Sequence, residues 1–137
     1  MGFLYEQRCS DSPYLETVIR GRTVGEGATV RPSEVHWHLV FVKYKGQSHS
    51  VFVGPLTTAG VVSYRDGAEI LWIKFRLGSF MPHLLPRDFQ DVETSLPGAA
   101  SQSFWLKGCA WQFPDYDNVE TFRFFMEIMV TAQDKRC

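Results

Sequence analysis

The sequence predicts a mainly β protein, a small sandwich or barrel followed by one C-terminal helix. Between residues 16 and 77, short runs of aromatic and β-branched residues recur at a spacing of about 8 to 12 residues, with glycine and proline between them. Aromatic residues make up 15% of the 137 residues, which favours a dense core. Apolar residues at helical spacing follow in the segment 119–133.

The first strands follow from residue type and turn chemistry. The runs 16–20 and 23–30 predict two short strands that glycines interrupt. The run 36–43 is rich in aromatic and β-branched residues and ends near Gly46, and 49–53 follows it. These two runs predict a hairpin.

A second hairpin is predicted from the runs 58–64 and 69–77. Asp66-Gly67 lies between them, and both of these residue types tolerate a positive φ in a tight turn. The turn chemistry therefore indicates that the two runs pair with each other.

Alternation along the strands predicts which side chains face the interior. His36 and His38 fall on the opposite face and are expected outside, as is Trp72, which would need a covering helix or a second subunit. The inward positions are Val35, Trp37, Leu39, Phe41, Leu71, Ile73, Phe75 and Leu77.

The segment 79–116 is an aromatic region that several prolines interrupt, with a single helical turn expected at 86–90. Asp115-Tyr-Asp-Asn118 is a capping-type cluster and predicts a helix over about 119–133. Phe124 and Ile128 lie away from its main apolar stripe and favour contact with another partner. The main stripe consists of Val119, Phe122, Met126 and Met129.

Charge and composition exclude several classes of protein. Fourteen basic and fifteen acidic residues give a net charge of −1 without a basic cluster, so direct DNA binding is not expected. No signal-type or membrane-spanning apolar run is present, and the three cysteines fit free thiols. We expect one domain over residues 1–137, in the cytoplasm and not bound to a membrane.

Two strings suggest a family. LGSFMPHL at 77–84 and SFWLKGCAWQFPDYDN at 103–118, followed by Thr121-Phe122, resemble the N-terminal sensor region of AraC-type transcription regulators. His36-Trp37, Gly54-Pro55 and the segment 74–78 match the same pattern in order. The resemblance implies a cupin-like, jelly-roll-type β-barrel that binds a small-molecule effector and dimerises through the helices that follow it.

The sequence departs from that pattern in two ways. It lacks the helix-turn-helix half with which such regulators bind DNA, and the polar segment 133–137 favours a natural free-standing sensor. Such a sensor would bind ligand alone or pair with a related full-length regulator. His38 stands where similar proteins tend to have an acidic residue.

A metal-dependent enzyme of the cupin type is the main alternative. His36 and His38 form an HxH pair, but 39–42 contains no Glu, and His49 and His83 lie in no matching motif. No nucleophile motif or phosphate-binding loop is present either. We therefore expect no enzymatic activity, no metal and no cofactor.

A small barrel of this kind either fills its interior with side chains or leaves room for one small molecule. Trp37, Phe41 and Phe75 are the candidate pocket walls. The candidate mouth residues are Phe80, Met81 and His83, with Trp111 closing over the pocket.

The expected function is non-catalytic effector binding with homodimerisation, and Phe124 and Ile128 are the candidate interface residues. A filled barrel that serves as an interaction module without a ligand remains the other alternative.

Overall fold

The computed structural model describes residues 2–31, 33–77, 79–80, 93–96, 98, 103–106, 109–121 and 130–131. Within this part of the chain the protein is mainly β, and every strand pair is antiparallel. The class predicted from the sequence is therefore confirmed, whereas closure into a cupin-like jelly roll remains a prediction.

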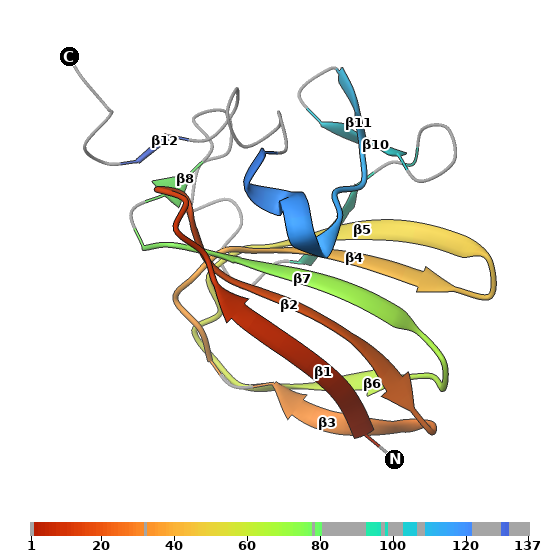
Figure 1. Cartoon of the computed structure of the whole chain (residues 1–137). Helices are drawn as coiled ribbons and strands as arrows, with labels where there is room; N and C mark the ends of the chain where they lie inside the picture. The colour runs from red at the N-terminus through yellow and green to blue at the C-terminus, as the bar shows by residue number, and fades with distance from the viewer. Residues whose placement is uncertain are drawn as a thin grey trace.

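One six-stranded sheet organises the fold (Figure 1). Its strands, in spatial order, are β1 (Gly2–Cys9), β2 (Leu15–Val24), β7 (Glu69–Phe75), β4 (His38–Tyr44), β5 (Gln47–Val53) and β9 (Glu93–Leu96).

Three two-stranded ladders and one 3₁₀ helix complete the described structure. The ladders pair β3 (Gly27–Arg31) with β6 (Gly60–Tyr64), β10 (Ser103–Leu106) with β11 (Cys109–Gln112), and β8 (Ser79–Phe80) with β12 (Val130–Thr131). The helix, η1, spans Tyr116–Thr121 and is kinked at Asn118. Figure 1 shows η1 and the β10–β11 ladder above the large sheet, and β3–β6 at the bottom of the view.

The first predicted hairpin is confirmed, because β4 pairs with β5 from His38↔Val53 to Tyr44↔Gln47. The second predicted hairpin is wrong. β6 pairs with β3, and β7 lies between β2 and β4.

The predicted turn at Asp66-Gly67 does form, with a φ of +83° at Gly67. Its contacts explain the changed pairing: the Gly67 amide donates to the Thr23 carbonyl at 3.1 Å, and the Thr23 amide donates to the Ala68 carbonyl at 3.0 Å. The turn therefore anchors the start of β7 on β2. Turn residues reverse the chain, but the contacts on either side decide which strands pair.

The N-terminal strand β1 was not among the predicted strands, and it pairs with β2 along its whole length. Gly21 lies inside β2 instead of ending a strand. An added Cβ there would come within 2.5 Å of the Phe3 ring and 2.6 Å of the Leu4 carbonyl oxygen. Close approach of β1 therefore requires this glycine.

The predicted alternation is confirmed inside the strands and wrong at their ends. Trp37, Leu39 and Phe41 are buried, as are Ile73 and Phe75. Two residues predicted to face inward, Val35 and Leu77, are 63% and 66% exposed. Both lie outside the strands, where a period of two no longer applies.

His38 was predicted to lie outside, and this is wrong, because only 4% of the residue is exposed. It does lie on the face opposite Leu39, but that face is not open to water at this position. Trp72 shares the face and is half-buried, and Lys74 shares it as well. Polar groups from neighbouring segments gather around these residues, as described below.

The predicted C-terminal helix is not confirmed. Within 119–133 the structure describes 119–121, which end the 3₁₀ helix, and 130–131, which form strand β12. The strand at 130–131 contradicts the predicted end of the helix, whereas residues 119–121 are helical, in a 3₁₀ and not an α-helical conformation. Val119 is fully buried and packs in the hydrophobic cluster on the sheet. Residues 122–129 and the helical turn predicted at 86–90 lie outside the described residues.

Candidate functional site

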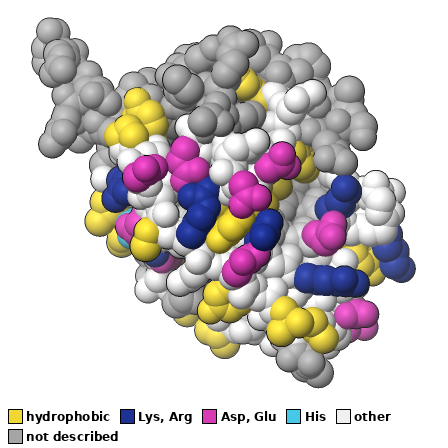
Figure 2. All heavy atoms as spheres, viewed as in Figure 1, with side chains coloured by type: hydrophobic (Ala, Val, Ile, Leu, Met, Phe, Trp, Pro, Cys, Tyr) yellow, Lys and Arg dark blue, Asp and Glu magenta, His cyan; other side chains and the backbone are white. Residues whose placement is uncertain are grey.

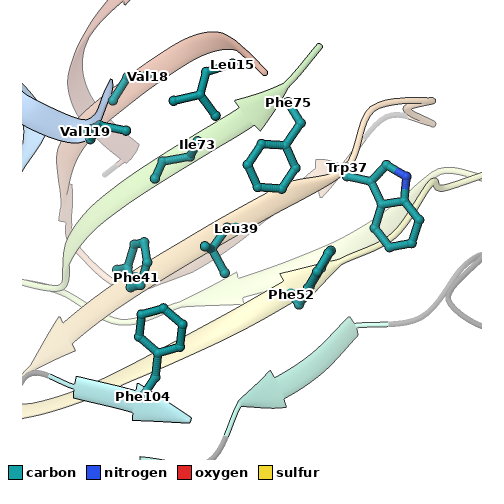
Figure 3. Packing of buried hydrophobic residues seen from close by; sticks show 10 residues of the cluster. All are labelled: Leu15, Val18, Trp37, Leu39, Phe41, Phe52, Ile73, Phe75, Phe104 and Val119. Atoms are coloured by element: carbon teal, nitrogen blue, oxygen red, sulfur yellow. The ribbon is translucent and has the colours of Figure 1, made fainter. Parts of the chain in front are cut away.

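The predicted pocket walls lie together in one buried cluster on the η1 side of the large sheet (Figure 3). The rings of Trp37 and Phe52 pack edge to face at 5.0 Å, and Phe52 and Phe75 at 6.4 Å. The ring centres of Phe41 and Phe104 are 5.4 Å apart. The cluster as a whole contains Leu15, Val18, Trp37, Leu39, Phe41, Phe52, Ile73, Phe75, Phe104 and Val119.

The structure describes the other predicted pocket and interface residues only in part. Trp111 is half-buried and packs against the same cluster. The side chain of Phe80, and all of Met81 and His83, lie outside the described residues. The predicted interface residues, Phe124 and Ile128, also lie outside them.

A groove of about 1000 Å³ opens beside this cluster and is called the ligand groove below. One of the predicted pocket residues, Phe41, lines it. The groove is formed by residues 4–6 of β1, 20–22 of β2, 41–43 of β4, 69–71 of β7, Ser48, and the segment 113–118 that leads into η1. Its volume is at the upper end of the range usual for small-molecule sites.

The segment 113–118 is held over the sheet by aromatic contacts and a local turn. The Phe113 ring lies 4.7 Å from the Phe41 ring. The Asp115 amide donates to Oδ1 of Asn118 at 3.2 Å, and the Asn118 amide donates to the Asp115 carbonyl. One wall of the ligand groove is thereby fixed to its floor.

A cluster of charges attaches η1 to β1 and β2. Arg8 donates to both carboxylate oxygens of Glu120, at 2.6 and 2.8 Å, and to the Tyr116 carbonyl at 2.6 Å. The Arg20 guanidinium, which pairs with Glu6, lies 4.4 Å from the centre of the Tyr116 ring. Figure 2 shows basic and acidic side chains interspersed across the middle of the face in view.

The Arg8 contact changes the acidity of Glu120. The two hydrogen bonds from the guanidinium, with a further bond from the Ser10 hydroxyl, lower the pKa of Glu120 to about 2. Glu120 therefore stays ionised and paired over the whole physiological range, and η1 stays docked beside the groove.

A second polar cluster lies on the opposite face of the sheet. Glu16 is the extra residue of a β-bulge in β2, between Leu15 and Thr17, and it lies 3.4 Å from Nζ of Lys74. Glu34 approaches the same ammonium at 3.2 Å. The two carboxylates therefore share one lysine.

The two histidines of the HxH pair make separate contacts at this cluster. Nδ1 of His36 lies 2.8 Å from the Phe75 carbonyl, so it is the protonated nitrogen, because a carbonyl can only accept. Its Nε2 faces Glu16 at 3.6 Å and Glu34 at 3.7 Å. Nδ1 of His38 instead accepts the indole N–H of Trp72 at 2.6 Å. The pair does not converge on a common point through these nitrogens.

Burial keeps His38 neutral, because removal of the ring from water lowers its pKa to about 4. The sequence alternative of a metal site at His36 and His38 is not supported: no three His, Cys, Asp or Glu side chains among the described residues are arranged to hold a metal ion. The Lys74 ammonium already lies between the two nearest carboxylates.

The sequence interpretation missed most of the groove, above all Arg22, Lys43 and Glu69. Alternation provides a signal for two of them. Lys43 continues the face of Leu39 and Phe41, and Glu69 precedes Leu71 on the matching face of β7. A polar residue at the end of an apolar sheet face marks the place where the core opens to water.

Comparison of the chain with protein-family models, with curated proteins and with solved structures finds no match. Among the described residues, none forms a helix of the length and hydropathy that crossing a bilayer requires.

Proposed function

We propose that this chain is a non-catalytic domain that binds a small-molecule effector in the ligand groove and forms a homodimer. The observation that carries the proposal is the groove itself, a space of about 1000 Å³ between the large sheet and the segment 113–118. Apolar side chains such as Phe41 and Leu71 line it together with charged ones. Such a combination suits a ligand with an apolar body and a few polar groups.

The sequence resemblance to the sensor region of AraC-type regulators supports the same proposal. In such a system the effector binds one arrangement of the dimer more tightly than another, and a related full-length regulator supplies the DNA-binding half. The effector's contacts with Tyr116 and Asp117 would reach η1 directly, because both residues line the groove and belong to that helix. The domain acts in the cytoplasm, where the exposed thiol of Cys9 stays reduced.

A thermal-shift screen of aromatic, cationic and anionic small molecules tests the binding proposal. A ligand at a hundred times its Kd stabilises the folded state by about 2.7 kcal/mol, so the melting temperature rises measurably. Ser48→Trp places a large ring in the groove and should abolish the shift. Ser63→Trp is the matched control, because Ser63 is exposed on β6 and does not line the groove.

Far-UV circular dichroism first confirms that both variants are folded. A screen without any stabilising compound would contradict the proposal. So would compounds that stabilise Ser48→Trp as strongly as the original protein. Sedimentation equilibrium tests the dimer separately, and a monomer at all concentrations would refute that part.

A further inference from the structure

Three charged residues form a row across the floor of the ligand groove. In the register of the sheet Arg22 pairs with Glu69, and Glu69 pairs with Lys43, so the three side chains lie on one face of β2, β7 and β4. All three are exposed and line the groove. The charges along the row are therefore positive, negative and positive.

These charges are not used to hold the fold together. Within the described part of the chain, Arg22, Lys43 and Glu69 make no ion pair within 4.0 Å and no side-chain hydrogen bond. Elsewhere on this face Arg8 is paired with Glu120, and Arg20 with Glu6. The row therefore remains available to a ligand, as do Asp115 and Asp117, which also line the groove and make no ion pair within 4.0 Å in the described part of the chain.

An apolar pair lies next to Glu69 and Lys43. Two residues further along β7 and β4, Leu71 pairs with Phe41, and the Phe113 ring lies 4.7 Å from the Phe41 ring. The corresponding residue of β2 is Arg20, which pairs with Leu71 on its other side. Two residues of a strand span about 6.6 Å. A ligand anchored at the charged row would therefore place a side chain of about that length against Leu71 and Phe113.

We propose that the groove takes a free α-amino acid with a large apolar side chain, with its ammonium on Glu69 and its carboxylate on Arg22 and Lys43. An α-amino acid carries one anionic and one cationic group on the same carbon atom, which suits neighbouring charges of opposite sign on adjacent strands. Arginine binds a carboxylate through two parallel hydrogen bonds, and this geometry orients the head group. The inference rests on the proposed function, because it names the ligand class of that same groove.

Four probes separate the parts of the ligand in a calorimetric titration of the full chain. L-phenylalanine has the complete head group and a ring, 3-phenylpropionate lacks the ammonium, 2-phenylethylamine lacks the carboxylate, and L-alanine lacks the ring. L-phenylalanine should bind at least about tenfold more tightly than each of the other three, since the loss of one charged contact, or of the apolar ring, costs about that factor.

Variants assign the contacts. Glu69→Gln should remove the preference for L-phenylalanine over 3-phenylpropionate. Arg22→Gln and Lys43→Gln should each weaken L-phenylalanine binding about tenfold. Lys45→Gln makes the same change of charge at an exposed position outside the groove and should leave the affinity unchanged.

Equal binding of 3-phenylpropionate and L-phenylalanine, with no effect of Glu69→Gln, would overturn the amino-acid inference and leave the groove as a ligand site. The same holds if none of the four probes binds while other compounds in the thermal screen do. Failure of every compound in both experiments would overturn the proposed function as well.

Discussion

The indole N–H of Trp72 donates a 2.6 Å hydrogen bond to Nδ1 of His38. Tryptophan can only donate through this nitrogen, so the proton of the neutral His38 ring is on Nε2. The two residues come from neighbouring strands, β7 and β4. Burial of the His38 ring and this hydrogen bond both favour the neutral imidazole.

Acid should destabilise the protein through His38. The pKa of this group is about 4 in the folded protein, against an ordinary value of 6.5 for an unfolded chain. Its contribution to stability is therefore present above pH 6.5 and is lost as the pH falls towards 4, with a slope of at most about 1.4 kcal/mol per pH unit. His38→Gln should remove this slope, as measured by urea unfolding followed through tryptophan fluorescence.

His49→Gln is the control for that experiment, because His49 is exposed on β5. It should keep the pH dependence of the original protein. If His38→Gln and the original protein lose stability in parallel over this window, His38 is not the group responsible.

The contact of Arg8 with Glu120 should lose its contribution to stability at a lower pH than His38 does. The pKa of Glu120 falls from 4.5 to about 2 on folding, so the contact stabilises the fold above pH 4.5 and is lost as the pH falls through 2. Glu120→Gln should cost about 1–2 kcal/mol at neutral pH and nothing below pH 2. Urea unfolding at the two pH values measures the difference.

Glu6→Gln is the matched comparison, since Glu6 pairs with Arg20 at the exposed surface. It should change the free energy of unfolding much less than Glu120→Gln does, because water and salt screen an exposed ion pair. An equal cost for the two variants would show that the partly buried position of Glu120 is unimportant.

Phe104 should make a large contribution to the free energy of unfolding. Its side chain is fully buried. The centre of its ring lies 5.4 Å from that of Phe41 and 6.0 Å from that of Phe113. Phe104→Ala should lower the free energy of unfolding by about 3–5 kcal/mol, because it leaves a cavity. Leu77→Ala, at an exposed position, should stay within about 0.5 kcal/mol. A small effect at Phe104 would mean that β10 is not packed on the sheet in solution.

The pairing of β1 with β2 should depend on Gly21. A methyl group there would meet the Phe3 ring and the Leu4 carbonyl at 2.5–2.6 Å, so Gly21→Ala has to displace β1. We expect a loss of about 1–3 kcal/mol and faster amide hydrogen exchange in residues 2–9. Gly98→Ala has open space around it and should change neither quantity. Unchanged exchange in Gly21→Ala would contradict the close approach of β1.

Local patterns in the sequence were sufficient for the fold class and for much of the core. The alternation through Trp37, Leu39 and Phe41 identified buried residues, because a strand with one covered face repeats every two residues. The turn at Asp66-Gly67 was also predicted correctly, because its conformation depends on only a few neighbouring residues.

Such local patterns could not predict contacts between residues that are far apart in the sequence. The pairing of β6 with β3, the burial of His38 and the contact of Arg8 with Glu120 each depend on a segment elsewhere in the chain. The predicted helix over 119–133 shows the same limit at its end, since Val130–Thr131 pairs with β8, which lies far earlier in the chain.

The sequence by itself therefore determined a mainly β chain with an aromatic core and almost no net charge. Only the tertiary structure decided where the core opens to water, because the ligand groove is assembled from five strands and the segment 113–118. Its charged row exists only in the register of β2, β7 and β4. Residue type and spacing act over a few residues, whereas register is set by the packing of the whole sheet.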